Sequence, residues 1–257
     1  MNPDSPQTSS ATGPRIQHAS LSDIGCRREK NEDAVGIFTC EAAPGALLLV
    51  VADGVGGNAA GEVASRIAVK TFGDRFFAAG VPDDLRVALH QTLLEANRAI
   101  LADAAVNPLR ANMATTCTAA VVRGQELVIG HIGDCRAYLA HDGQLFPLTE
   151  DHSLGGEYRR QGQALPPDKQ SLSNVLTRWL GNEEGVEPDI GNPVVFADGA
   201  TLVLCSDGLT KVIHDPEILR IVSMHLPQRA CQLLVERARK EGGPDNITVV
   251  VARQNRT

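Results

Sequence analysis

Segments with strand-like and helix-like patterns fall in separate blocks along this chain of 257 residues. Two early strand regions are followed by two helical patterns, then by a run of short strands, and finally by a strand pair, two helices and a last strand. These blocks cover 16–39, 47–52, 62–77, 85–100, 115–148, 192–205, 216–225, 228–240 and 247–252. A parallel fold needs strands and helices that alternate, so this order predicts an α+β fold with antiparallel sheets and helices packed outside them.

Turn signals divide the strand blocks. Asp142-Gly143 and Asp198-Gly199 each lie between two strand-like runs and are predicted to form hairpin tips. Turns at Arg123-Gly124 and Gly133-Asp134 are expected to link the strands of an antiparallel meander. The pattern breaks from 151 to 188, which predicts an irregular flap, about 153–188, with a helical turn within "LSNVLTRWLG".

Acidic residues stand at the ends of several strands. Asp53 and Asp207 each end an apolar run and are followed by glycine and then by loop or helix, which is not a hairpin pattern. Asp245 precedes the last strand and Glu32-Asp33 precedes an early one. Carboxylates gathered at one edge would repel each other, and divalent cations would relieve that repulsion. Oxygen ligands without a cluster of histidines or cysteines indicate Mg²⁺ or Mn²⁺ rather than zinc.

Composition narrows the class of protein. The formal net charge of −7 argues against nucleic acid or an anionic membrane as the main partner. No apolar run approaches the length of a membrane span. The six cysteines are scattered without a C-x-x-C pair, which favours reduced thiols and a cytoplasmic location. We expect a disordered leader over 1–14 and a single domain over 15–255.

Six motifs, taken together and in order, resemble the metal-dependent protein phosphatases of the 2C type. They are "SDIGCRREKNEDA", "VVADGVGGNAAGEVAS", "GHIGDCRAYL", "TEDHSL", "LCSDGLTKV" and "GGPDNITVVV". The resemblance spans about 16–252 and is greatest to bacterial members that oppose Hanks-type Ser/Thr kinases. It implies a four-layer α-β-β-α sandwich, in which pairs of antiparallel helices flank two antiparallel sheets. It also implies two metal ions at one end, bridged by a water that attacks phosphorus directly.

The resemblance also implies a role for each matching residue. Arg28, Asp53 and Asp207 would be catalytic, with Arg28 binding the phosphate through its planar guanidinium. The plain alternative for Arg28 is a surface ion pair with Glu32. The implied metal residues are Asp53 bridging both ions, the Gly54 carbonyl on one, Asp207 and Asp245 on the first, Glu32 on the second and Asp33 on metal-bound waters.

Two positions depart from the family pattern. Many eukaryotic members have a histidine where this chain has Val55, so the proton for the leaving oxygen would come from a metal-bound water or a flap group, unless the substrate has a better leaving group. Many relatives also bind a third ion with the residue at Asp134 and an acid where this chain has Lys211. We therefore predict a weak or absent third site. The alternative is that Lys211 points to solvent or pairs with Asp207.

The sequence therefore predicts a protein Ser/Thr phosphatase that uses two Mn²⁺ or Mg²⁺ ions. Its expected partners are cytosolic phosphoproteins and a cognate Ser/Thr kinase, and we expect a monomer. The alternative is a non-catalytic, phosphoprotein-binding pseudophosphatase of the same fold, although none of the two-metal ligands is missing. Arg159 and Arg160 in the flap would either contact substrate or remain solvated.

Overall fold

The computed structural model describes residues 16–55 and 60–255, so the leader expected over 1–14 lies outside the described residues. Two antiparallel sheets pack face to face. The first has the strand order β2 (Asp33–Thr39), β3 (Leu47–Asp53), β4 (Cys117–Arg123), β5 (Glu126–Ile132) and β8 (Asp189–Ile190), and β9 (Val194–Val195) also pairs with β5. The second has the order β1 (Ile16–Asp23), β11 (Ile247–Gln254), β10 (Thr201–Cys205), β6 (Arg136–His141) and β7 (Gln144–Pro147).

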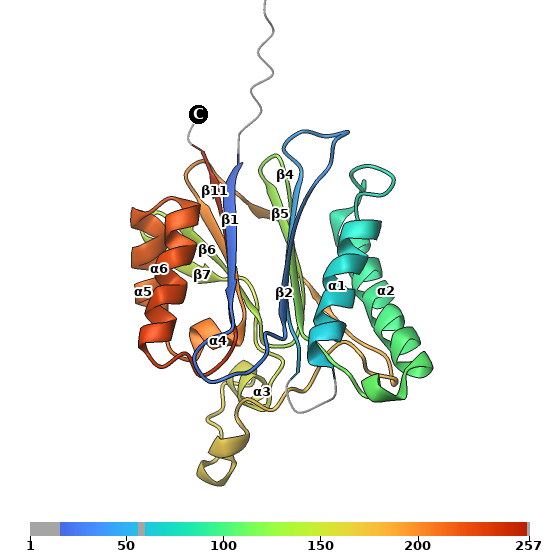
Figure 1. Ribbon diagram of the computed structural model, residues 1–257. Helices are drawn as coiled ribbons and strands as arrows, with labels where there is room; N and C mark the ends of the chain where they lie inside the picture. Colours follow the sequence, from blue (N-terminus) through green and yellow to red (C-terminus); the bar gives the residue numbers. More distant parts are fainter. Residues whose placement is uncertain (1–15, 56–59, 256–257) are drawn as a thin grey trace, which may run out of the picture.

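Helices cover the outer face of each sheet, as Figure 1 shows. Helices α1 (Gly61–Arg75) and α2 (Leu85–Val106) pack on the first sheet, and α5 (Asp215–Met224) and α6 (Pro227–Lys240) pack on the second. Asp84 caps α2, because its carboxylate accepts hydrogen bonds from the amides of Arg86 and Val87 at 2.9 and 3.0 Å. This arrangement confirms the predicted four-layer sandwich.

Three apolar cores hold the layers together. The central core lies between the sheets and includes Leu49, Val51, Leu204 and Val250, all fully buried. The other two lie between each sheet and its helices. Strands β3, β4, β10 and β11 are buried on both faces, which explains why they read as continuous apolar runs rather than alternating ones.

Two turns that we expected within one sheet, at Gly133-Asp134 and Asp198-Gly199, instead connect strands of different sheets. Asp142-Gly143 is the tip of the β6–β7 hairpin, as predicted. The Asp198-Gly199 prediction was wrong, because β9 before it belongs to the first sheet and β10 after it to the second. The meander likewise breaks at Gly133-Asp134, between β5 and β6. A turn signal describes local backbone and does not say which sheet the next strand joins.

The flap contains helix, most of it before the segment where we predicted a helical turn. Helix α3 (Leu154–Arg160) begins after Ser153, whose hydroxyl accepts the Gly156 amide, and a 3₁₀ turn covers Pro167–Leu172. Of the helical turn expected within 172–181, only the first residues form a turn, with the Val175 amide donating to the Leu172 carbonyl at 3.0 Å. The rest of the segment is extended, with backbone hydrogen bonds from the Thr177 amide to the His152 carbonyl and between Thr115 and Leu180.

Candidate metal centre

The strand-end carboxylates converge at one end of the sandwich. Asp33 and Asp53 are directly opposite each other in the β2–β3 pairing. Asp207 starts the short helix α4 (Asp207–Thr210) immediately after β10, which is paired with β11. Helices α3 and α4 lie at this same end in Figure 1. The fold therefore brings together acids that are far apart in the sequence, as predicted.

Ser206 joins the two sheets at this end. Its hydroxyl donates to Asp33 Oδ2 at 2.8 Å and accepts the Thr248 amide at 3.0 Å. Asp33 belongs to the first sheet, whereas Ser206 follows β10 of the second. Sequence reasoning missed Ser206, although its place directly before the Asp-Gly pair was a signal. The hydrogen bond fixes Asp33 Oδ2. Because a carboxylate is planar and rigid, this also restricts where Oδ1 can lie.

Asn246 fixes the loop that carries Glu32. Its side-chain oxygen accepts the Glu32 amide at 2.9 Å, and its amide group donates to the carbonyls of Ile24 and Lys30. The Glu32 carbonyl in turn accepts the Gly54 amide at 3.1 Å. Asn246 was also missed by sequence reasoning, because it lies next to Asp245 and its role becomes visible only when the loop is in place.

A cleft of about 820 Å³ opens over this end of the sandwich. The flap supplies one wall, including Val175, Leu176 and Trp179. Most of the predicted site residues line the cleft: Arg28, Asp53, Gly54, Asp134, Asp207 and Asp245, together with Val55 and Lys211. Glu32 and Asp33 do not line it. The cleft is large enough for a phosphorylated side chain and neighbouring peptide groups.

The gathered carboxylates raise one another's pKa values. Burial, followed by the charges of Asp33 and Asp207, raises the pKa of Asp53 well above its usual range. Burial raises the pKa of Asp33 to about 6, although hydrogen bonds from Thr248 and Ser206 oppose the shift. Burial and Asp207 raise the pKa of Asp134 to about 7. A divalent cation would stabilise the ionised form of all three.

Two buried carboxylate oxygens show how a cation would fit. Asp33 Oδ1 and Asp207 Oδ1 are buried and accept no hydrogen bond from any residue that the structure describes. Buried carboxylate oxygens without a donor are costly, and an oxygen-only set suits Mg²⁺ or Mn²⁺. Within 16–55 and 60–255, however, no three acidic, histidine or cysteine side chains already stand as a group that could hold a metal ion.

Lys211 and Arg28 bind two of the predicted metal ligands. Lys211 Nζ lies 2.6 Å from Asp207 Oδ2 and 2.8 Å from Asp245 Oδ2. Arg28 reaches Asp245 through Nε at 2.8 Å and Nη2 at 2.9 Å. Burial acts to raise the pKa of Asp245, but hydrogen bonds from Lys211 and Arg28 lower it overall. Lys211 thus follows the expected alternative of pairing with Asp207, and Arg28 pairs with Asp245 instead of Glu32.

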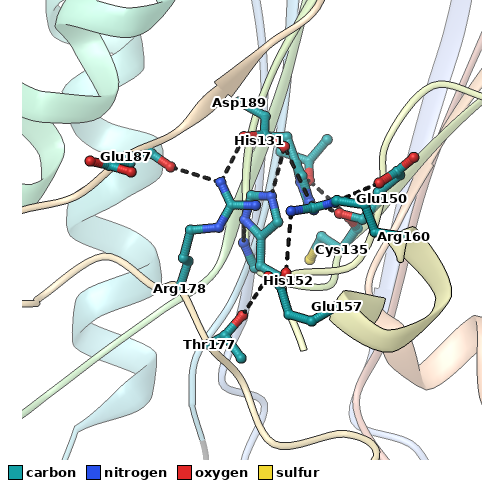
Figure 2. Close-up of polar contacts among 12 residues, drawn as sticks. His131, Cys135, Glu150, His152, Glu157, Arg160, Thr177, Arg178, Glu187 and Asp189 are labelled. Atoms are coloured by element: carbon teal, nitrogen blue, oxygen red, sulfur yellow. Dashed lines mark hydrogen bonds and ion pairs between the residues drawn. The ribbon is translucent and has the colours of Figure 1, made fainter. Parts of the chain in front are cut away.

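The flap is attached to the sandwich through a buried histidine, His152 (Figure 2). The Gly133 amide donates to His152 Nδ1 at 3.1 Å, and His152 Nε2 donates to Asp189 Oδ2 at 3.0 Å. Arg178 from the flap also donates to Asp189, at 2.6 Å. These contacts connect the flap to the Gly133-Asp134 turn at the edge of the cleft.

The two flap arginines that we considered for substrate contact are engaged within the protein. Arg159 pairs with Asp151 at 2.8 Å, and Arg160 pairs with Glu150 at 2.8 Å. Asp151 is also held by Arg136 in a fork with two contacts of 2.7 Å. These ion pairs therefore attach helix α3 to the loop between β7 and α3.

His131 packs against His152, with ring centroids 4.6 Å apart. We expect its burial to make the stability of the protein depend on pH. Its Nε2 donates to the Glu150 carbonyl, and burial, followed by His152, lowers its pKa from 6.5 to about 3. As the pH falls, the unfolded chain binds a proton at this histidine near pH 6.5, whereas the folded chain does so only near pH 3. The free energy of unfolding is therefore fully retained above pH 6.5 and decreases as the pH falls toward 3. The nearby charges of Asp189 and Asp151 oppose the shift only in part.

We expect His131→Gln to be less stable than the wild type at pH 7, with the difference shrinking by a few kcal/mol as the pH falls to about 4. Denaturant unfolding across this pH range measures it, and the exposed His90→Gln is the control for the loss of a histidine. A difference between wild type and His131→Gln that stays constant with pH would show that His131 is not held neutral.

Comparisons with known proteins agree with this geometry. A family model described as protein phosphatase 2C matches residues 27–241. The serine/threonine phosphatase stp of Listeria monocytogenes is 36% identical over 247 residues, which cover 93% of this chain and 97% of that protein. The Streptococcus agalactiae serine/threonine phosphatase structure superposes with a TM-score of 0.84 at 31% identity, covering 94% of this chain and all of that one.

One of the solved structures holds metal. The catalytic domain of the serine threonine protein phosphatase PstP, in complex with two manganese ions, superposes with a TM-score of 0.81 at 34% identity. The match covers 93% of this chain and 98% of that domain. The family model, the relatives and the fold agree over nearly the same residues. This chain belongs to the protein phosphatase 2C family.

Proposed function

We propose that this chain is a metal-dependent protein Ser/Thr phosphatase. Its substrates would be phosphoserine and phosphothreonine on cytosolic proteins, and it would oppose a Hanks-type Ser/Thr kinase. The observation that carries the proposal is a pair of buried carboxylate oxygens, Asp33 Oδ1 and Asp207 Oδ1, at one end of the sandwich, to which no residue within 16–55 and 60–255 donates a hydrogen bond. The relatives named as serine/threonine phosphatases support the substrate class.

Two divalent ions, when bound, would supply an activated water and stabilise charge on the transferred phosphoryl group. Asp53, Asp207, Asp245, Glu32 and the Gly54 carbonyl would hold the ions, with Asp33 orienting their waters. Strand ends make these positions rigid: the Asp53 carbonyl accepts the Thr116 amide at 2.9 Å, and the Asp53 amide donates to Thr116 Oγ1 at 3.2 Å.

Arg28 would bind the phosphate. Its side chain is 41% exposed, lines the cleft and already presents two nitrogens to the carboxylate of Asp245. Two oxygens of a phosphate group can accept the same pair of hydrogen bonds from the guanidinium. Arg28 could therefore release the Asp245 carboxylate and bind the phosphate of a substrate instead. Val55 lines the same cleft, and because its side chain has no ionisable group, another group would protonate the leaving oxygen. We also propose that a third ion binds weakly, because Lys211 replaces an acid.

Location and assembly are part of the same proposal. No helix among the described residues is long and apolar enough to cross a membrane. We propose a cytoplasmic monomer whose single catalytic domain, over 15–255, meets phosphoproteins and a cognate kinase in solution.

A second candidate function is a pseudophosphatase that binds phosphoproteins without cleaving them. The observation in its favour is that Lys211 and Arg28 occupy oxygens of Asp207 and Asp245. In that case the cleft would bind a phosphorylated segment through Arg28 and Lys211 alone.

One experiment separates the two functions. Phosphate release from a phosphothreonine peptide is measured with Mn²⁺, with Mg²⁺ and with chelator, while binding is followed by the fluorescence of Trp179, the single tryptophan, which lines the cleft. A phosphatase releases phosphate only with metal. A pseudophosphatase changes the fluorescence and releases none under any condition.

A further inference from the structure

Lys211 lies at a position where its charge acts on two predicted metal ligands at once. It follows the short helix α4 and is four residues after Asp207, the spacing that places two side chains on the same face of a helix. Asp245 lies on a different segment, in the loop two residues before β11. The ammonium of Lys211 touches one oxygen of each, at 2.6 and 2.8 Å. It therefore bridges the two carboxylates.

The three side chains of this bridge are largely buried from solvent. The carboxylates of Asp207 and Asp245 are 17% and 15% exposed, and the Lys211 side chain is 30% exposed. In such surroundings two carboxylates repel more strongly than at the surface, and a cation between them offsets that repulsion. Asp207 and Asp245 are also the two residues assigned to the first divalent ion. A divalent ion and the ammonium would compete for the same oxygens.

We propose that Lys211 is a built-in counter-cation that holds Asp207 and Asp245 together and must be displaced when the first divalent ion binds. This inference rests on the proposed two-metal function. Lys211 lines the cleft, and its flexible stem allows the ammonium to swing out toward solvent. Displacement adds the same free-energy cost to Mn²⁺ and Mg²⁺. The lysine therefore weakens the binding of both ions by one common factor, while stabilising the fold when free metal is scarce.

The test compares wild type with Lys211→Met, which keeps the length of the side chain and removes its charge. Calorimetric titration with Mn²⁺ should show the first ion binding about tenfold more tightly to the variant, which corresponds to about 1.4 kcal/mol. Titration with Mg²⁺ should show the same factor. In chelator the variant should melt several degrees lower than wild type, because Asp207 and Asp245 then repel each other with only Arg28 nearby.

Lys70→Met is the matched control, since Lys70 forms a surface pair with Asp74 at the same four-residue spacing. It should leave both metal affinity and melting temperature close to those of wild type. Equal Mn²⁺ affinity in wild type and Lys211→Met would overturn the inference and leave the two-metal function standing. Absence of Mn²⁺ binding in both proteins would overturn the two-metal function and this inference with it.

Discussion

Replacement of Asp53 by asparagine is expected to abolish activity and to stabilise the metal-free protein. Asp53 lies at the end of β3 opposite Asp33, where burial and neighbouring carboxylates raise its pKa well above the usual range. Without the bridging carboxylate, phosphate release should fall by about 10³-fold or more, or about 4 kcal/mol of transition-state stabilisation. In chelator the free energy of unfolding should rise by about 1–2 kcal/mol, because the folded protein no longer bears the cost of burying a carboxyl group among other acids.

The opposite signs of these two effects make the test specific. A residue needed only for folding would lose activity and stability together. Asp74→Asn, on the surface of α1, is the control for the loss of one carboxylate and should change neither quantity appreciably. Activity of Asp53→Asn within tenfold of wild type would rule out a bridging role for Asp53.

Replacement of Gly208 by alanine is expected to unfold much of the catalytic edge. A Cβ at this position would lie 1.9 Å from the Asn246 carbonyl oxygen and 2.9 Å from its carbon. Helix propensity alone predicts that alanine in α4 would stabilise by about 1 kcal/mol. The clash with backbone outweighs this gain, so we expect a net loss of about 3 kcal/mol or more. The clash also pushes Asp245 away from Asp207 and should reduce activity.

Gly191→Ala is the matched control, because its nearest neighbour would be the Ile129 carbonyl oxygen at 3.5 Å, an ordinary contact. Thermal unfolding of both variants in chelator separates the structural effect from metal binding. If Gly208→Ala were as stable as wild type, the close approach of α4 to the start of β11 would be incorrect.

The layers of the fold could be predicted from the sequence because strands and helices occur in blocks. Apolar runs such as Leu47–Asp53 and Thr201–Cys205 are buried on both faces, so their pattern is strong. The assignment of strands to sheets was harder. Gly133-Asp134 and Asp198-Gly199 look like hairpin turns locally, but the partner of each strand is decided by long-range pairing. The same turn at Gly133 brings Asp134 to the cleft.

The candidate site was predictable where one residue type carries the chemistry. Asp53 and Asp207 could be found because an acid at the end of an apolar strand is costly unless it has a use. Ser206 and Asn246 could not be found in this way, because they act through hydrogen bonds to residues about 170 and 210 positions away. Lys211 could be noted as a departure, but its contact with Asp245 depends on how β11 begins.

The number of Mn²⁺ ions bound per folded chain, measured by equilibrium dialysis, tests the central claim most directly. The carboxylates at the end of the sandwich predict two tightly bound Mn²⁺ ions per chain, with a third ion bound only weakly because of Lys211. Fewer than two ions on a protein that is shown to be folded would contradict the two-metal account of this site.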